Sequence, residues 1–234
     1  MPLPESTVEN WNATTGSTLV EAYGLTETSP AATITPFGQT RKPGTIGLFV
    51  PSTHARIVQV DNPDVDVEFG EPGELLIKGP QVFVGYWNNP EETAKTLLPD
   101  GWLRTGDVVT MDDEGFVTIV DRVKDLIISG GFNVAPTEVE DIVRQHPDIA
   151  DVAVFGRPVK PAGEQVMAAV ILNEGATLDI LGLREFCRQK LAPYKIPARI
   201  VAVDSLPRTA LGKVQRRLAR EQLLGSGSSL ISHD

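Results

Sequence analysis

Residues 121–132 read DRVKDLIISGGF, and the character of the sequence changes across this stretch. Mixed charges around Arg122 and Lys124 lead into a short apolar run and then into the pair Gly130-Gly131. Such a stretch could form a hinge followed by a hairpin that another group approaches closely, and it is equally typical of a solvated linker. We place a domain boundary at Asp121–Lys124.

Upstream of this boundary, short apolar runs alternate with turn residues between Gly44 and Val120. This pattern predicts several short antiparallel strands, among them 55–60, 73–77 and 116–120, separated by turns at 61–63, 71–73 and 112–115. A helix is expected over residues 4–16, a strand over Thr18–Ala22, and a short helix that opens at Pro90 with acidic residues in its first turn. Residues 1–120 are therefore predicted to be rich in strands.

Downstream of the boundary, apolar residues recur at helical spacing. They predict a helix over Thr137–Gln145, with Thr137 and Glu140 as a capping box. Further strands are expected at 150–155, 166–172 and 200–203, and further helices at 180–191 and 213–224. Helices beside a small mixed sheet predict a compact α+β domain over residues 125–224, and the Gly/Ser-rich residues 225–234 predict a flexible tail.

Composition excludes several classes of protein. The formal net charge of the 234-residue chain is −10, which argues against nucleic-acid binding. Cys187 is the single cysteine, and its apolar neighbours favour a buried, inert thiol. The three histidines lie far apart, so no zinc site is expected. Without a signal peptide or an apolar run of about 20 residues, a cytoplasmic protein with no transmembrane segment is expected, and peripheral membrane contact stays open.

The segment Tyr23-Gly24-Leu25-Thr26-Glu27-Thr28 combines an aromatic ring, hydroxyls and a carboxylate after a predicted strand. Tyr23 could stack on a base, Thr26 could bond a phosphate, and Glu27 could hold Mg²⁺. Taken alone, the same residues favour an ordinary polar turn with a half-buried tyrosine.

Two further segments carry groups that suit a nucleotide. In residues 101–107, GWLRTGD, the carboxylate of Asp107 could accept hydrogen bonds from two vicinal hydroxyls, although a capped turn has the same composition. In residues 206–217, LPRTALGKVQRR, Lys213 lies on a glycine-containing loop that opens a helix. No acidic residue interrupts 207–220, so this stretch suits a phosphate-bearing ligand or forms a basic solvated face.

In this order and roughly at these separations, the four segments resemble the later core motifs of the adenylate-forming superfamily. That superfamily includes acyl-CoA synthetases, aryl-CoA ligases, luciferases and the adenylation domains of peptide synthetases. Gly79–Val82, Gly85–Trp87 and Gly131–Val134 resemble its fatty-acid–CoA ligase branch. The resemblance runs from about Pro2 to Leu224. It implies the C-terminal portion of an acyl-CoA synthetase, with residues 1–120 from the large AMP-binding domain, a hinge at 121–124, and a mobile lid domain at 125–224.

For the nucleotide, the resemblance implies five contributing residues. Tyr23 and Gly24 would bind the nucleotide, with the Tyr23 ring stacked on adenine. Thr26 would contact the α-phosphate and Glu27 would bind Mg²⁺, both as catalytic residues. Asp107 would hold the ribose hydroxyls.

For the rest of the reaction, the resemblance implies five more residues. Arg122 would contact the same ribose region, and Lys124 would be the hinge between two half-reactions. Gly130 and Gly131 would line the pantetheine channel. Lys213 would steady the carboxylate and the α-phosphate during adenylation.

The reaction that the resemblance implies is the ATP- and Mg²⁺-dependent activation of a carboxylic acid as acyl-AMP, followed by transfer to CoA. The resemblance to the fatty-acid–CoA ligase branch implies a fatty acid as the substrate. The family's Ser/Thr/Gly-rich phosphate loop lies far upstream, and Thr14–Ser17 stands too close to Tyr23 to be that loop. We therefore expect a missing N-terminal domain and no turnover by this chain alone. Ala22 stands where many relatives have Gly, which puts the shape of the acyl pocket in question.

Three alternatives stay open from the sequence. The chain could bind nucleotide and CoA without turnover, or it could be a purely structural piece. It could also belong to another adenylate-forming enzyme, such as an aryl-CoA ligase or a peptide-synthetase adenylation domain.

Overall fold

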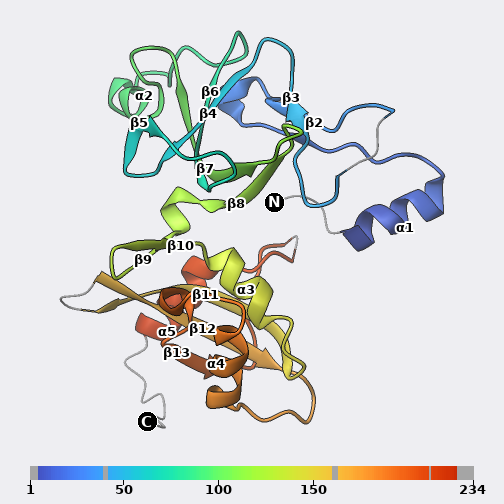
Figure 1. Cartoon of the computed structure of the whole chain (residues 1–234), viewed down its shortest axis with the longest axis vertical. Coiled ribbons are helices and arrows are strands. Elements are labelled where there is room, and N and C mark those ends of the chain that lie inside the picture. The colour runs from blue at the N-terminus through green and yellow to red at the C-terminus, as the bar shows by residue number, and fades with distance from the viewer. Residues whose placement is uncertain (1–4, 39–41, 160–162, 211, 226–234) are drawn as a thin grey trace. The chain divides into compact units, whose positions relative to one another are not determined.

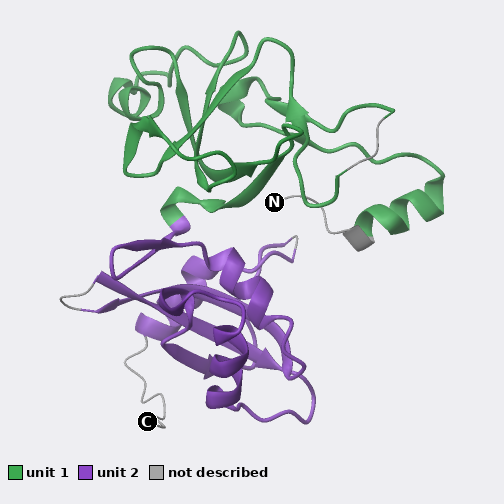
Figure 2. Ribbon diagram, viewed as in Figure 1, with its two compact units in different colours: residues 1–124 green, residues 125–234 purple. Residues whose placement is uncertain are grey.

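The computed structural model describes residues 5–38, 42–159, 163–210 and 212–225. The chain divides into two compact units, Met1–Lys124 and Asp125–Asp234 (Figure 2). The described residues contain helices and mainly antiparallel sheets, joined by loops, which confirms the predicted α+β class (Figure 1).

The larger sheet of the first unit is antiparallel, with strand order β5-β4-β6-β7-β8. Its strands are β4 (His54–Gln59), β5 (Asn62–Asp66), β6 (Gly73–Lys78), β7 (Leu103–Met111) and β8 (Val117–Arg122). The central strand β6 is buried on both faces, because Leu75 and Ile77 point to one side, Leu76 points to the other, and none of the three is exposed. This core fixes the neighbouring strand β7.

A smaller sheet of the first unit contains β1 (Ala22–Tyr23), β2 (Thr33–Ile34) and β3 (Leu48–Phe49). The strand expected over Thr18–Ala22 is mostly wrong, because the pairing with β2 begins only at Ala22. At Glu21 the backbone N–H donates instead to Oγ1 of Thr35 at 3.3 Å.

Short helical segments complete the first unit. They are α1 (Glu5–Thr15), α2 (Pro90–Thr96), and the 3₁₀ turns η1 (Thr26–Thr28) and η2 (Val123–Asp125). The helix expected at Pro90 is confirmed, and Asn89 caps it by accepting a hydrogen bond from the N–H of Glu92 at 3.3 Å. The helix expected over residues 4–16 corresponds to α1.

The second unit is built on a five-stranded sheet with strand order β10-β9-β12-β11 and with β13 parallel to β12. Its strands are β9 (Ile127–Ser129), β10 (Phe132–Val134), β11 (Ile149–Val159), β12 (Gly163–Leu172) and β13 (Arg199–Ala202). The long pair β11–β12 forms the centre of this unit. The predicted strands at 150–155 and 166–172 lie within β11 and β12, and the one predicted at 200–203 overlaps β13 and extends one residue beyond its end.

Helices cover both faces of this second sheet (Figure 1). They are α3 (Pro136–Val143), α4 (Ile180–Arg188) and α5 (Arg216–Gly225), with a 3₁₀ turn η3 (Pro193–Lys195). Val152 and Val154 of β11 pack in one apolar cluster with α3 and α4, and Phe155 packs in another with α5. Cys187 of α4 is fully buried in the first cluster, and this burial raises the pKa of its thiol, as expected of an inert side chain.

Two local expectations are wrong. The capping box at Thr137 and Glu140 is absent, because α3 starts after Ala135 and the carboxylate of Glu140 instead accepts the N–H of Val154 at 2.9 Å. The turn considered at Asp107 is also absent, because Asp107 lies inside β7 and pairs with Arg122 of β8.

Candidate functional site

Asp107 is the most buried of the residues to which the resemblance assigns a role, with 3% of its surface exposed. Its Oδ2 accepts a hydrogen bond from the Tyr23 hydroxyl at 2.7 Å, and its Oδ1 lies 3.2 Å from Nε of Arg122. Arg122 reaches Asp107 because the two residues stand opposite each other in the β7–β8 ladder. A buried carboxylate needs such partners. Tyr23 and Arg122 therefore both contact the carboxylate of Asp107, and the resemblance assigns all three residues to one nucleoside.

Tyr23 enters this group from β1, and its ring packs against the apolar core of the first unit. Burial raises the pKa of Tyr23 far above its usual range, and the negative charge of Asp107 raises it further. The phenol therefore keeps its proton and remains a donor to Asp107. This hydrogen bond fixes the direction of the aromatic ring.

The turn after Tyr23 has a shape that only glycine permits at its start. A Cβ on Gly24 would lie 1.6 Å from the carbonyl oxygen of Pro30, which no side chain can tolerate. Oγ1 of Thr28 closes the turn by accepting a hydrogen bond from the N–H of Leu25 at 2.8 Å. Thr26, at the first position of η1, is left exposed.

Glu27 is held by Tyr86, a residue outside the segments that predict the nucleotide site. The hydroxyl of Tyr86 donates a hydrogen bond to Oε1 of Glu27 at 2.6 Å, and this bond raises the pKa of Tyr86. The N–H of Phe83 also donates to the Glu27 carbonyl at 2.9 Å. Mg²⁺ in nucleotide sites is commonly held by one or two carboxylates together with phosphate oxygens and water. A half-buried carboxylate oriented through one oxygen fits that requirement.

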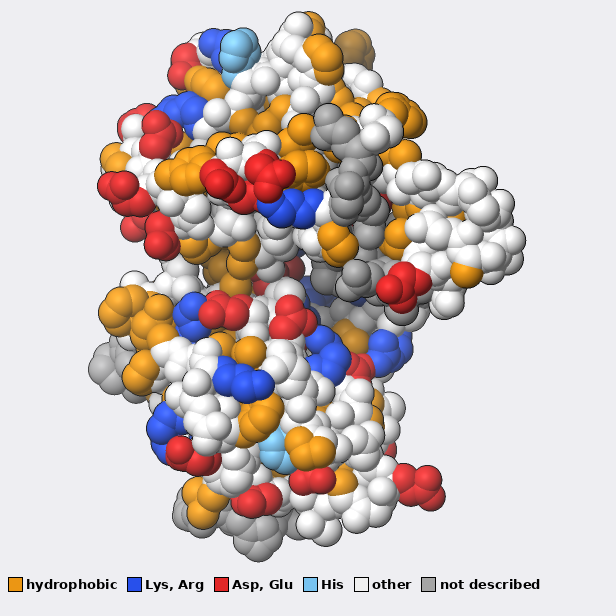
Figure 3. Space-filling model, turned by 45° about the vertical axis from the view of Figure 1, so that its right-hand side comes forward, with side chains coloured by type: hydrophobic (Ala, Val, Ile, Leu, Met, Phe, Trp, Pro, Cys, Tyr) orange, Lys and Arg blue, Asp and Glu red, His pale blue; other side chains and the backbone are white. Residues whose placement is uncertain are grey.

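The described ranges hold neither a clustered metal site nor a membrane-spanning helix. No group of three or more His, Cys, Asp or Glu side chains there could hold a metal ion. No helix among the same residues is long and apolar enough to cross a bilayer. On the face drawn in Figure 3, acidic and basic side chains lie among one another.

Thr14–Ser17, which stand too close to Tyr23 to be the family's phosphate loop, span the last two residues of α1 and the two residues after it. Oγ1 of Thr15 donates back to the carbonyl of Trp11 at 2.9 Å, and the N–H of Gly16 donates to the carbonyl of Asn12 at 2.9 Å. Gly16 has a φ of 66°, as is common just after a helix. These residues therefore cap a helix.

Gly130 and Gly131 form the two-residue turn between β9 and β10. Ser129 and Phe132 pair across it, and the φ angles of the glycines are 59° and 85°. Positive φ at both central residues is the requirement of a tight hairpin turn, which explains the double glycine. Lys124 lies in η2 with an exposed side chain.

Lys213 lies in a tight loop immediately before α5. The N–H of Thr209 donates to the Lys213 carbonyl at 2.8 Å, and the N–H of Lys213 donates to Oγ1 of Thr209 at 3.2 Å. The N–H of Gly212 also donates to the Thr209 carbonyl at 2.9 Å. The Lys213 side chain is exposed, and its ammonium has no hydrogen-bond partner among the described residues. The charge is therefore available to a ligand.

Comparison with known proteins places these features in a family. A model of the AMP-binding enzyme family matches residues 1–87, and a model of the AMP-binding enzyme C-terminal domain matches residues 138–213. The chain belongs to the AMP-binding enzymes. This finding confirms the family that the four segments predicted.

The relatives that this chain matches include several CoA ligases. It is 44% identical over 225 residues to a long-chain-fatty-acid–CoA ligase of Escherichia coli O6:H1, an alignment covering 96% of this chain and 39% of that protein. It is also 44% identical over 207 residues to an indoleacetate–CoA ligase of Aromatoleum aromaticum, with coverage of 88% and 40%.

Among solved structures, ATP-bound MatB from Rhodopseudomonas palustris aligns with a TM-score of 0.81 and 38% identity, covering 94% of this chain and 44% of that one. The chain thus spans about two fifths of the length of the curated relatives that it matches.

Proposed function

We propose that this chain is the C-terminal part of an ATP-dependent acyl-CoA synthetase, which activates a carboxylic acid as acyl-AMP and then transfers the acyl group to CoA. The observation that carries the proposal is the meeting of Tyr23 and Arg122 on the buried carboxylate of Asp107. A fixed carboxylate can accept hydrogen bonds from the vicinal hydroxyls of a ribose, and a fixed aromatic ring beside it offers a surface for a base.

In the first half-reaction the acid attacks the α-phosphate of ATP and pyrophosphate leaves. Thr26 contacts the α-phosphate, and Glu27 holds Mg²⁺ while Tyr86 orients the carboxylate. When bound, the ion stabilises negative charge on the phosphate oxygens. Lys213 supplies a second positive charge to the carboxylate and the α-phosphate. Electrostatic stabilisation of this kind needs no covalent intermediate on the protein.

In the second half-reaction the CoA thiol displaces AMP from acyl-AMP. Gly130 and Gly131 line the passage for pantetheine, where a tight turn without side chains leaves room for a ligand. Lys124 is the hinge between the two half-reactions. Its exposure and its place in a short 3₁₀ turn support this role, because the backbone there can change conformation without disturbing a core.

The proposed acid is a fatty acid. Relatives named long-chain-fatty-acid–CoA ligases from Escherichia coli and Bacillus subtilis support this proposal at 44% and 45% identity. An aromatic acid is the second candidate, because the indoleacetate–CoA ligase shares 44% identity with the chain. The identities are equal, so exchange measured with each acid has to decide between the two candidates.

The test measures ATP–pyrophosphate exchange by the longer protein of which this chain is proposed to be the C-terminal part, so that the acid preference measured is the protein's own. Exchange that depends on a long-chain fatty acid supports the proposal. Exchange with indoleacetate alone would mean that the substrate is an aromatic acid. Calorimetric titration of the 234-residue chain with AMP and CoA separately tests binding. Nucleotide binding without exchange by the longer protein would favour a binding module over an enzyme.

A further inference from the structure

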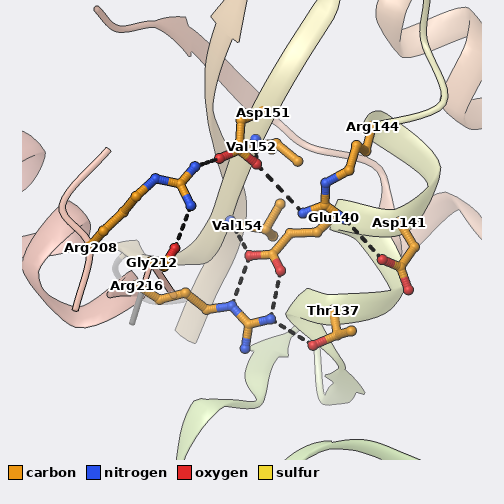
Figure 4. Close-up of polar contacts among 10 residues, drawn as sticks. All are labelled: Thr137, Glu140, Asp141, Arg144, Asp151, Val152, Val154, Arg208, Gly212 and Arg216. Carbon is orange, nitrogen blue, oxygen red and sulfur yellow. Dashed lines mark hydrogen bonds and ion pairs between the residues drawn. The ribbon is translucent and has the colours of Figure 1, made fainter. Parts of the chain in front are cut away.

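Arg208 connects the Lys213 loop to the central sheet of the second unit (Figure 4). Its Nη1 donates a hydrogen bond to the carbonyl of Gly212 at 2.6 Å, and its Nη2 donates to Oδ2 of Asp151 in β11. Gly212 directly precedes Lys213. Because a guanidinium is planar and rigid, two contacts from its two terminal nitrogens fix the Gly212 carbonyl relative to β11.

Asp151 is itself held in a fixed orientation. Its Oδ1 accepts a hydrogen bond from the N–H of Val152 at 2.8 Å and lies 3.7 Å from Nη2 of Arg144. Only 17% of the Asp151 side chain is exposed. The acceptor for Arg208 is therefore part of the strand framework.

A second and separate anchor lies three residues after Lys213. Arg216 donates from Nε and Nη2 to the two carboxylate oxygens of Glu140 at 2.8 and 2.6 Å, and Nη2 also donates to Oγ1 of Thr137 at 2.6 Å (Figure 4). Glu140 is 7% exposed and also accepts the N–H of Val154. The backbone of Lys213 therefore lies between two side-chain contacts, the partly exposed pair of Arg208 and Asp151 and the buried pair of Arg216 and Glu140.

We propose that Arg208, oriented by Asp151, is a positioning residue that sets the direction in which Lys213 leaves its loop. This proposal rests on the proposed function of Lys213. The Arg208 side chain is 44% exposed, so its ion pair is screened by water and contributes little to folding. Catalysis is more sensitive to position than folding is, because small displacements of a reacting group slow a reaction strongly. Loss of Arg208 should therefore affect the reaction more than the stability.

For the buried pair of Arg216 and Glu140 we expect the reverse: its loss should lower the stability of the fold more than the rate of the reaction. Glu140 and Arg216 join α3, β11 and the start of α5 through charged groups that water hardly reaches. Removal of one partner would leave the other charge buried and unpaired, which destabilises the fold. The two arginines that flank Lys213 thus have separable roles.

The first test is amide hydrogen exchange on the 234-residue chain, which needs no catalytic activity. In Arg208→Gln we expect the Gly212 and Lys213 amides to exchange about fivefold faster, as for the loss of one hydrogen bond. Arg217→Gln is the matched control, because Arg217 pairs with Glu221 on the exposed side of α5. Unchanged exchange in Arg208→Gln, or equal acceleration in the control, would overturn the proposal.

The second test measures the two half-reactions separately in the longer protein. Arg208→Gln should lower kcat of adenylation by about 10- to 100-fold, with thioester formation from supplied acyl-AMP and the midpoint of thermal unfolding unchanged. Asp151→Asn should give a smaller loss of about threefold, because the Gly212 contact remains. Equal loss of both half-reactions together with a lowered unfolding midpoint would show a structural role and contradict the proposal.

Arg208→Lys tests whether simultaneous contact with Asp151 and the Gly212 carbonyl is required. A lysine keeps the charge opposite Asp151 but lacks the planar fork that reaches two acceptors at once, so adenylation should stay impaired. Full activity in this variant would mean that charge alone suffices, and the positioning role would fall. If the unaltered protein shows no adenylation at all, the proposed function fails, while the exchange measurement still decides whether Arg208 orders the loop.

Discussion

Asp107 and Lys213 are held in opposite ways. Asp107 lies inside a nine-residue strand, is almost fully buried, and receives partners from two other strands. Lys213 lies on a short exposed loop, and the contacts that order the loop fall on its neighbours Arg208 and Arg216 rather than on its ammonium. The surroundings of Asp107 provide a rigid, preformed binding group. The loop of Lys213 presents a positive charge that can contact a ligand or move away from it.

This difference matches the two tasks in the proposed reaction. A nucleoside is bound in both half-reactions, so its partners gain from rigidity. The charge on the α-phosphate must be stabilised in the first half-reaction only, so its partner gains from a position that can change. The following variants test whether this contrast holds, and all except the last are made in the longer protein.

Lys213→Ala should have the largest effect. Removal of the ammonium takes a positive charge from the transition state of adenylation, and groups of this kind are worth about 10²- to 10³-fold in kcat. Thioester formation from supplied acyl-AMP should be retained. Pyrophosphate release and acyl-AMP consumption, measured separately, check this result. A parallel loss of both activities would contradict the proposal that Lys213, unlike Asp107, acts in the first half-reaction only.

Lys124→Pro should impair one half-reaction by roughly 30-fold and leave the other largely intact. Proline fixes φ near −65°, so the backbone could serve only one of two conformations. Lys124→Ala is the matched control, because it removes the same side chain and leaves the backbone free. Similar behaviour of both half-reactions in the proline variant would rule out the hinge.

Asp107→Asn should weaken AMP binding by about tenfold, because an amide is a poorer acceptor than a carboxylate for two hydroxyl donors. Tyr23 keeps an acceptor in this variant, so the fold should survive. Asp66→Asn is the control, since Asp66 pairs with Arg56 at an exposed edge of the same sheet. Calorimetric titration with AMP measures the effect. Equal affinities of the two variants would show that Asp107 does not bind the nucleoside.

Tyr23→Phe should have the smallest effect, visible at alkaline pH in the 234-residue chain. Burial and Asp107 raise the pKa of Tyr23 in the folded state, so the folded state keeps a proton that the unfolded state loses. The stabilisation from the neutral phenol is therefore complete well below pH 10, the unfolded pKa, and is lost as the pH rises through that value towards the folded pKa. Urea unfolding should show a contribution from Tyr23 that falls by roughly 0.8 kcal/mol between pH 9 and 10.5. An identical pH slope in Tyr23→Phe would contradict the raised pKa.

Local patterns predicted the elements that depend on local chemistry. Gly130-Gly131 indicated a hairpin because a tight turn needs positive φ at both positions. Pro90 and the acids after it indicated the start of α2. The turn predicted at residues 61–63 was wrong, because Pro63 belongs to the edge strand β5. Proline is tolerated in an edge strand because the N–H that it lacks need not form a hydrogen bond to a neighbouring strand. Asp107, after a glycine, lies inside a strand for which no local signal was present.

Contacts across long sequence separations could not be predicted from local patterns. The resemblance pointed to Tyr23 and Asp107, which are 84 residues apart, but only the fold shows that they share a hydrogen bond. Tyr86 and Glu27 are 59 residues apart, and Arg208 and Asp151 are 57 apart. Glu140 looked like a cap for its own helix because its partner, Arg216, lies 76 residues away. Partners of this kind depend on how strands, helices and loops pack together in the folded chain.

The buried thiol in α4 gives the second unit a reporter of its own. Cys187 is the single cysteine of the chain, and none of its surface is exposed in the folded state. A thiol reagent can therefore modify the protein only when α4 separates from the sheet beneath it. The rate of modification would measure how often this unit opens, without any added label and without interference from a second site.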